Sequence, residues 1–354
     1  MRSILTILVC VMLCSCAVRN LKSKTELIKG VYGNPETLLK AGYRFDSLGM
    51  NAVFVRSGSL TSAFFNTAKE QGCQVFVEFP TLNGSGYLKA HPEAWPINEK
   101  GERAPPADWF MGVCPTNTAF KQHRIAELKK ILQEYDVDGI FLDYVHLHAQ
   151  FETVNPILPE TCFCNNCISE FSAHTGLSIP GADTKAKARW ILDSADVPWR
   201  VWRTGILTGW VTDMKDMVRS QRPDAKLGVF YCAWYPQEFD SALHRILGID
   251  IRALATQADV LAPMLFHRMM GKDTEWVGEY VAWLGGEIRK KKLVTKIWPI
   301  VQADNKSGPV SPEEFLKVMI NGSKAPASGI MMFADQSLLE DPEKLSVMKT
   351  LYRK

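Results

Sequence analysis

The feature that most constrains the fold is an alternation of short apolar runs with longer amphipathic stretches, which occurs eight times along the chain. The runs are rich in Val, Ile, Phe and Tyr, residues that favour strands. They cover residues 28–32, 51–56, 74–80, 138–145, 226–232, 260–266, 296–302 and 329–335. Near-continuous apolar runs are typical of strands buried on both faces of a parallel sheet. Eight such units predict a closed (β/α)8 TIM barrel over residues 27–354.

An open, doubly wound parallel sheet would show the same alternation. However, no glycine-rich phosphate-binding loop follows the first predicted strand, so the dinucleotide-binding version of that fold loses its main support. Pro263 and Pro299 lie inside the sixth and seventh predicted strands. Proline cannot donate to a strand ladder, so both positions weaken the predicted strand boundaries.

Helix starts are marked at several places between the predicted strands. Asn34-Pro35 predicts an N-cap followed by proline at the first helical position. Ser311 and Glu314 have the spacing of a capping box, and Asp341-Pro342 predicts the start of the last helix. An insertion of about eighty residues, 146–225, separates the fourth strand from the fifth.

The N-terminus differs from the rest of the chain. Arg2 precedes an apolar run, 4–13, which is too short for a permanent membrane span and predicts a signal peptide over residues 1–15. Leu13-Cys14-Ser15-Cys16 resembles a bacterial lipobox. This resemblance implies cleavage before Cys16, lipidation of its thiol, and a polar tether over residues 16–26. We therefore expect an exported, membrane-anchored lipoprotein on the periplasmic or cell-surface side, with an ordinary cleaved signal peptide as the alternative.

The charge of the chain is nearly balanced. It has 354 residues with 41 basic and 38 acidic side chains, for a formal net charge of +3. The one basic block, Arg289-Lys290-Lys291-Lys292, is typical of a solvated helix end. A nucleic acid is therefore disfavoured as a partner.

The active site of such a barrel is built from strand C-termini and the loops that follow them. Asp143 is the foremost candidate because it ends a fully apolar strand, where a carboxylate is costly unless it has partners or a function. An ion pair with Arg56 is the structural alternative. Other side chains expected at the barrel mouth, as substrate-binding groups, are Arg56, Glu78, Tyr144, His146, Trp234, His267, Gln302 and Asp335. Four aromatic residues in the predicted loops have flat rings suited to stacking on sugars: Trp95, Trp109, Trp234 and Tyr235.

A group of cysteines follows the fourth predicted strand. Cys162, Cys164 and Cys167 form a C-x-C-x-x-C pattern, and Cys114 lies upstream. Four thiolates form a closed tetrahedral set suited to structural zinc. A disulfide between Cys114 and one of the other three is the alternative in an oxidising compartment.

Two segments resemble known glycosidases. Residues 138–144, Asp-Gly-Ile-Phe-Leu-Asp-Tyr, resemble the fourth-strand motif of barrel glycoside hydrolases, several families of which use an aspartate here as nucleophile. The cysteine set, with Cys114 followed by Pro115, resembles the zinc knuckle of family 42 β-galactosidases and of the uncharacterised "hypothetical glycosyl hydrolase" families. The resemblance is best over residues 114–176, and it implies a barrel glycosidase with a structural zinc and no organic cofactor.

The catalytic pair of family 42 does not carry over. Those enzymes have a glutamate acid/base on the fourth strand and a glutamate nucleophile on the seventh, whereas this chain has Asp143 on the fourth and Gln302-Ala303-Asp304 on the seventh. Glycoside cleavage needs a second carboxyl. Glu238 after the fifth strand and Asp304 after the seventh are the candidates, an arrangement that loosely resembles the α-amylases.

The function expected from the sequence is hydrolysis of a glycosidic bond in an oligo- or polysaccharide. Asp143 would be the central carboxylate, with Glu238 or Asp304 as proton donor. Another hydrolase or lyase using the same pocket is one alternative. A carbohydrate-binding lipoprotein that lacks catalysis is the other.

Overall fold

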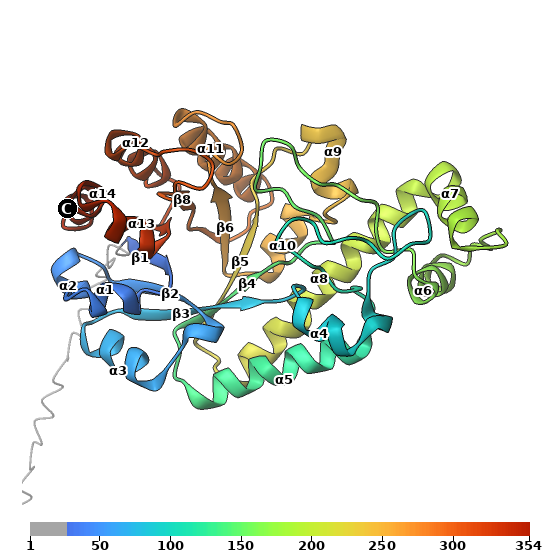
Figure 1. Ribbon diagram of the computed structural model, residues 1–354, viewed down its shortest axis with the longest axis horizontal. Coiled ribbons are helices and arrows are strands. Elements are labelled where there is room, and N and C mark those ends of the chain that lie inside the picture. The colour runs from blue at the N-terminus through green and yellow to red at the C-terminus, as the bar shows by residue number, and fades with distance from the viewer. Residues whose placement is uncertain (1–26) are drawn as a thin grey trace, which may run out of the picture.

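The computed structural model describes residues 27–354, which form a closed barrel of parallel strands surrounded by helices (Figure 1). Its strands are β1 (Ile28–Gly33), β2 (Ala52–Arg56), β3 (Gln74–Pro80), β4 (Gly139–Asp143), β5 (Lys226–Cys232), β6 (Val260–Leu265), β7 (Lys296–Ile297), β8 (Ile300–Gln302) and β9 (Gly329–Phe333). Consecutive strands pair in parallel from β1 to β6, β6 pairs with both β7 and β8, and β8 pairs with β9. The pairing of β9 with β1 closes the ring. The predicted (β/α)8 TIM barrel is therefore confirmed.

The two strand prolines have different effects. Pro299 interrupts the seventh strand, so that β7 and β8 are the two halves of one barrel position, separated by Trp298 and Pro299. Pro263 lies within β6 opposite Tyr231 and leaves that strand continuous. The barrel thus has eight strand positions and nine strand segments.

The barrel interior is filled by aromatic rings, each accommodated by a small residue on a neighbouring strand. Phe54, Phe76, Phe141 and Trp298 have ring centroids 4.9–6.3 Å apart. A methyl group added at Gly228 would lie 2.3 Å from the Phe141 ring. Bulky inward side chains can fill the barrel only where an opposite position is left empty.

The helices are α1 (Glu36–Lys40), α2 (Phe45–Leu48), α3 (Ser62–Glu70), α4 (Ser85–Ala90), α5 (Thr118–Glu134), α6 (Asn165–Thr175), α7 (Thr184–Ser194), α8 (Asp196–Gln221), α9 (Glu238–Arg245), α10 (Ile251–Gln257), α11 (Glu275–Lys290), α12 (Pro312–Gly322), α13 (Asp335–Glu340) and α14 (Pro342–Tyr352). Ser311 caps α12 and Asp341 caps α14, as predicted.

The helix start predicted at Asn34 is wrong by one residue. Pro35 is the N-cap of α1, and no side chain caps that helix. The backbone N–H of Asn34 instead donates to Asp335 Oδ1 at 3.0 Å, across the β9–β1 closure. This contact ties the start of α1 to the far end of the chain, and no side chain takes the place of the predicted cap.

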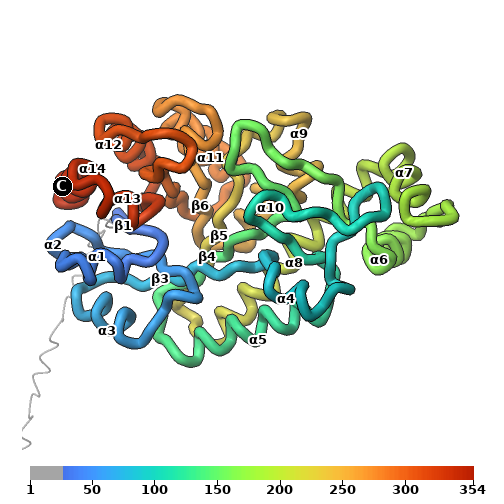
Figure 2. Tube along the Cα trace, in the orientation of Figure 1, coloured from blue at the N-terminus to red at the C-terminus, as the bar shows by residue number. Residues whose placement is uncertain are grey.

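Two long connections, after β3 and after β4, run beside each other over the C-terminal side of the barrel (Figure 2). They are joined by an antiparallel bridge between Asn98 and Thr161. The second connection continues into α6 and α7, which extend away from the barrel. The insertion predicted over 146–225 ends with α8, which packs along α5 in the position of a barrel helix.

The predicted signal peptide (1–15), the tether (16–26) and the lipidation site Cys16 lie outside the described residues. Within residues 27–354, none of the helices combines the length and apolarity needed to cross a membrane.

Candidate active site

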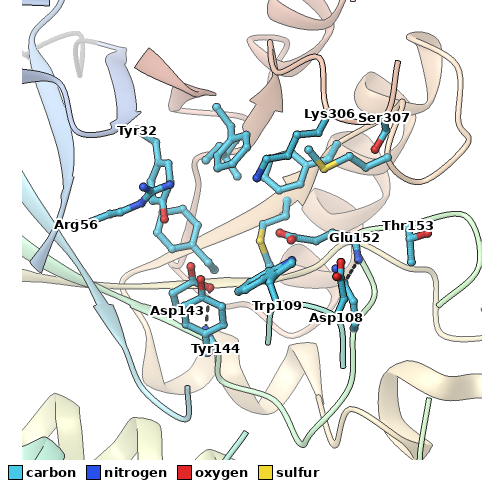
Figure 3. Close-up of a pocket in the computed structure, with 17 residues that line it drawn as sticks. Tyr32, Arg56, Asp108, Trp109, Asp143, Tyr144, Glu152, Thr153, Lys306 and Ser307 are labelled. Carbon is cyan, nitrogen blue, oxygen red and sulfur yellow. Dashed lines mark hydrogen bonds between the residues drawn. The ribbon is translucent and has the colours of Figure 1, made fainter. Parts of the chain in front are cut away.

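A cavity of about 410 Å³ opens at the C-terminal mouth of the barrel (Figure 3). Strand ends and the loops after β3, β4, β6 and β8 contribute its walls. The lining residues are Tyr32, Arg56, Asp108, Trp109, Asp143, Tyr144, Gln150, Glu152, Thr153, Phe230, Met264, Phe266, Met269, Ile300, Lys306, Ser307 and Phe333. The cavity therefore has an apolar floor from the barrel core and a polar wall from the loops.

Asp143 is the last residue of β4, a strand whose five residues are all buried. Its backbone carbonyl accepts a hydrogen bond from Thr81 N–H at 2.8 Å, and its Oδ1 accepts one from Tyr144 N–H at 2.7 Å. Burial raises the pKa of Asp143 to about 6, against the lowering effects of the Tyr144 N–H and of Arg56. The strand thus holds a carboxyl group at the cavity wall that titrates near neutral pH.

Glu78 lies behind the cavity wall on β3, where its register neighbour on β2 is Arg56. It is 4% exposed and does not line the cavity. Burial, and then the charge of Asp143, raise the pKa of Glu78 to about 8, while Arg56 and Arg124 lower it. Two neighbouring buried carboxyls cannot both ionise freely, so Glu78 is held protonated while Asp143 is charged.

Arg56 and Tyr32 form the cavity wall on the side of β1 and β2. The Arg56 guanidinium lies over the Tyr32 ring, 5.6 Å from its centroid. Arg56 lowers the pKa of both Glu78 and Asp143. Its charge therefore partly offsets the cost of burying these two carboxyls.

Glu152 is a cavity residue that the sequence did not single out. It lies in the connection after β4, and its backbone N–H donates to Gln150 Oε1 at 2.6 Å. Burial, and then the charge of Asp143, raise the pKa of Glu152 to about 8, against the lowering effect of Lys306. In Figure 3 Asp143, Glu152 and Lys306 all point into the cavity. Of the three carboxyls that line the cavity, Asp108, Asp143 and Glu152, the last two have raised pKa values, and these values differ.

Of the four loop aromatics predicted to stack on sugars, Trp109 lines the cavity. Its ring is 48% exposed and packs edge-on against Tyr144 at 5.6 Å. The ring of Phe110 also stacks on Tyr144, with the ring centroids 5.5 Å apart. Trp95, Trp234 and Tyr235 do not line the cavity.

Several predicted site residues lie outside the cavity and have other partners. Glu238 pairs with Lys272 and accepts a hydrogen bond from Tyr235 N–H at 2.7 Å. Asp304 Oδ1 accepts a hydrogen bond from Lys306 N–H at 2.7 Å, at the base of the loop that carries Lys306 into the cavity. The structure therefore does not bring either of these carboxyls to the cavity with Asp143.

The remaining predicted groups brace the loops of the mouth. Gln302 Oε1 accepts hydrogen bonds from the N–H groups of Arg268 and Met269 at 3.0 and 3.2 Å. His267 Nε2 contacts Glu314 Oε1 at 2.8 Å, and Asp335 Oδ2 accepts a hydrogen bond from Thr37 Oγ1 at 2.5 Å. Buried Trp234 packs against Phe151 and Phe239.

Of the two histidines after β4, His148 joins the long connections to each other. His148 Nδ1 accepts a hydrogen bond from Gly112 N–H at 3.1 Å and its Nε2 contacts the Pro105 carbonyl at 2.7 Å. His146 Nδ1 contacts the Leu147 carbonyl at 2.8 Å, and burial lowers its pKa to about 4. Both imidazoles are therefore neutral at pH 7, and His146 also lines a small recess beside the main cavity.

The four cysteines predicted to act together converge beneath the long connections. The Sγ atoms of Cys114, Cys162, Cys164 and Cys167 lie within 4.8 Å of one another. Cys114 Sγ is 3.5 Å from Cys164 Sγ and 3.6 Å from Cys167 Sγ, and the cysteines are free thiols. Four sulfurs around one zinc ion, with bonds of about 2.3 Å, would be separated by about 3.8 Å. The side chains thus fit a closed four-thiolate site.

Comparisons with known proteins locate the fold among glycosidases. No family model matches the chain, and no curated protein matches its sequence. The structure is similar to the PgaB (BpsB) glycoside hydrolase domain from Bordetella bronchiseptica, with a TM-score of 0.67 and 13% identity, covering 91% of this chain and 98% of that one.

Two β-galactosidases have the same barrel. The enzyme from the psychrophilic Marinomonas ef1 matches with a TM-score of 0.66, 11% identity and 93% coverage of this chain. A catalytic mutant of Gan42B, a GH42 β-galactosidase from G. stearothermophilus, matches with a TM-score of 0.60, 13% identity and 92% coverage. This chain spans 59% and 57% of their respective lengths. At these identities the likeness establishes the fold, and function depends on the site.

Proposed function

We propose that this protein is a glycoside hydrolase in which Asp143 and Glu152 are the reacting carboxyl groups. The observation that carries the proposal is that both groups point into one cavity and have raised pKa values of about 6 and about 8. Carboxyls whose environments separate their pKa values are suited to opposite roles as acid and base. The glycosidases among the similar structures support this class of reaction.

The two pKa values support opposite roles for these carboxyls. At neutral pH Glu152 retains its proton and can donate it to the glycosidic oxygen of the leaving group. Asp143 is ionised and acts as nucleophile or as the base that activates water. Glu152 takes the proton-donor role for which the sequence offered Glu238 and Asp304, because those two carboxyls do not line the cavity.

The rest of the cavity suits a sugar substrate. The exposed face of Trp109 offers a flat apolar surface on which a pyranose ring can stack, as in many protein–carbohydrate contacts. Arg56 stabilises the ionised form of Asp143 and can donate hydrogen bonds to sugar hydroxyls. Lys306 lies beside Glu152 and can hydrogen-bond to the leaving sugar.

The direct test is release of reducing sugar from a panel of oligo- and polysaccharides. Asp143→Asn and Glu152→Gln should each abolish most of the turnover, and the loss in Glu152→Gln should exceed that in Glu238→Gln. Glu134→Gln, on an exposed helix end, is the matched control. If the wild-type protein binds a glycan of the panel without cleaving any, the cavity belongs to a carbohydrate-binding protein and the glycosidase proposal fails.

We also propose that Cys114, Cys162, Cys164 and Cys167 hold a structural zinc ion. The support is the convergence of four sulfurs into one buried cluster and the absence of a disulfide among the described cysteines. A four-thiolate ion has no open position for substrate, so it would supply stability and no chemistry. The ion would fasten the connection after β4, which carries Glu152, to the connection after β3, which carries Trp109.

The cellular location is proposed from the sequence. The signal-peptide pattern and the lipobox-like Cys16 support export and attachment to a membrane through a lipid. Metabolic labelling with a radioactive fatty acid, in wild type and in Cys16→Ser, is the test. Equal labelling of the two proteins would refute lipidation at this residue.

A further inference from the structure

The end of the barrel opposite the cavity is closed by a ring of backbone hydrogen bonds between strand starts. Ile28 N–H donates to the Ser328 carbonyl at 3.2 Å, and Ser328 N–H donates to the Ile297 carbonyl at 3.0 Å. The first residue of β1 is therefore two strand positions from β7. The α8–β5, α10–β6 and α11–β7 connections all lie at this same end, because every strand runs from it toward the cavity.

These three connections surround a shallow hollow of about 560 Å³. Lys215, Lys226 and Lys296 line it. The hollow also contains Arg219, whose guanidinium binds both carboxylate oxygens of Asp259 at 2.6 and 2.8 Å. The charges of Arg219 and Asp259 neutralise each other, and the pair links the end of α8 to the start of β6. The three lysines form no ion pair with any described residue, so their charges remain available.

The end of α11 adds more positive charge beside the hollow. Arg289, Lys291 and Lys292 are exposed and have no ion-pair partner among residues 27–354. Lys290 is different, because it pairs with Glu287 at 2.7 Å. We call the six unpaired cations, Lys215, Lys226, Arg289, Lys291, Lys292 and Lys296, the basic face. Asp224 is the one unpaired acid lining the hollow in the described part of the chain.

An exposed apolar side chain, Val294, lines the hollow together with Lys215, Lys226 and Lys296. Val294 is 96% exposed, the most exposed large hydrophobic residue among those described. In the chain it lies between Lys292, whose φ of 55° is in the left-handed region, and Lys296. A lone exposed valine needs no explanation by itself. Here, however, it shares the hollow with three unpaired lysines and follows three more cations in the chain. Such a surface can meet anionic lipid headgroups with its charges and the acyl boundary with its apolar tip.

We propose that the basic face docks on an anionic lipid surface, so that the cavity at the other end of the barrel faces away from the membrane. Charge complementarity carries the choice of partner, since clustered lysines attract the negative surface of a bilayer. The place where the described chain begins agrees with it. Ile28 enters the barrel at this end. This support rests on the proposed lipidation of Cys16, from which the residues up to the barrel would connect to a bilayer on this side. Twelve residues span at most about 43 Å when fully extended.

The test measures binding of the full chain to vesicles of phosphatidylcholine alone and to vesicles with 30% phosphatidylglycerol. The readout is the ratio of the two partition coefficients, in which any contribution from the N-terminal segment is shared by all variants. Lys291→Gln/Lys292→Gln/Lys296→Gln should lower this ratio by about tenfold or more, because each lysine near an anionic surface contributes several-fold. The matched control, Lys89→Gln/Lys100→Gln/Lys185→Gln, removes the same charge from exposed, unpaired lysines elsewhere and should leave the ratio near that of wild type.

A second pair of variants tests the apolar tip. Val294→Asp should also lower the anionic-to-neutral ratio, whereas Val197→Asp, at a valine that is 72% exposed on α8, should not. Raising the salt concentration to 0.5 M should reduce the ratio for wild type toward 1. The proposal is overturned if wild type shows no preference for anionic vesicles, or if both lysine triples lower the ratio equally. It is also overturned if the basic-face triple weakens binding to a duplex DNA probe and leaves vesicle binding unchanged.

Discussion

The backbone N–H of Tyr144 lies 2.7 Å from Oδ1 of Asp143 and donates a hydrogen bond to it. Tyr144 adopts a φ of 57°, in the left-handed region that non-glycine residues rarely occupy. This turn at the end of β4 places an N–H donor on the carboxylate immediately after the strand. The donor favours the ionised form of Asp143, which burial disfavours, and so keeps the pKa of this carboxyl near 6 instead of higher. Strained backbone of this kind is common at functional sites.

Asp143→Asn removes the charge while retaining the shape of the side chain. If Asp143 is the nucleophile or base, turnover should fall by about 10³-fold or more, and glycan binding should remain within a few-fold of wild type. Kinetics and binding on the same oligosaccharide measure both. Parallel losses of binding and turnover would assign Asp143 to substrate binding, against its proposed role.

The pH dependence of kcat/KM should be bell-shaped. Activity should rise as Asp143 loses its proton near pH 6, and it should fall as Glu152 loses its proton near pH 8. In Glu152→Gln the alkaline limb should disappear, most visibly with an activated aryl glycoside whose leaving group needs no proton. Persistence of the alkaline limb in this variant would exclude Glu152 as the acid.

The barrel could be predicted from the sequence because its strands are buried on both faces and are therefore nearly continuous in apolar residues. The same reasoning located Asp143, since a carboxylate that ends such a strand is conspicuous. The grouping of the four cysteines could also be predicted from the sequence, because three of them, Cys162, Cys164 and Cys167, lie close together in the chain. The break at Trp298 and Pro299 was less visible, because a proline inside an apolar run can either interrupt a strand, as here, or be tolerated, as at Pro263.

Glu152 and Lys306 could not be predicted in the same way. Both reach the cavity from loops, and their positions depend on contacts between segments distant in sequence. The hydrogen bonds of His148 to the Gly112 and Pro105 backbone, for example, fix the connection after β4 against the connection after β3. Conversely, Glu238 follows a predicted strand closely, but it lies outside the cavity and pairs with Lys272. The position of a residue in the sequence therefore constrains its location in the fold much more tightly at a strand end than in a loop.

Trp109→Ala should weaken substrate binding more than catalysis. The exposed ring lines the cavity against Tyr144, so its loss removes a stacking surface without touching either reacting carboxyl. We expect KM to rise by about tenfold, with kcat changed by less than about threefold. Steady-state kinetics decide this, and Trp95→Ala serves as the control because Trp95 lies outside the cavity. Equal effects of the two substitutions would show that the change is structural.

Removal of metal should loosen the region around the cysteine cluster before the barrel. Cys114, Cys162 and Cys167 belong to a second buried core that includes Phe171 and Trp199, separate from the barrel core. We expect about one zinc per chain, lost in Cys167→Ser and retained in Cys73→Ser, whose thiol is buried elsewhere. A strong chelator should lower the Tm of the wild type and leave Cys167→Ser unchanged. Metal-free protein with an unaltered Tm in chelator would contradict a zinc site.

The buried carboxyl of Glu78 should make stability depend on pH. Its pKa in the folded protein, about 8, exceeds the ordinary value of 4.5. The folded state therefore binds this proton more tightly than the unfolded state, and the associated stability is complete below pH 4.5 and is lost as pH rises toward 8. Glu78→Gln cannot ionise, so its free energy of unfolding should decline less than that of wild type between pH 5 and pH 9. Urea unfolding at the two pH values measures the difference, with the exposed Glu134→Gln as the control. A steeper decline in Glu78→Gln than in wild type would show that the ionised carboxylate is stabilised by Arg56 and Arg124 more than it is destabilised by burial.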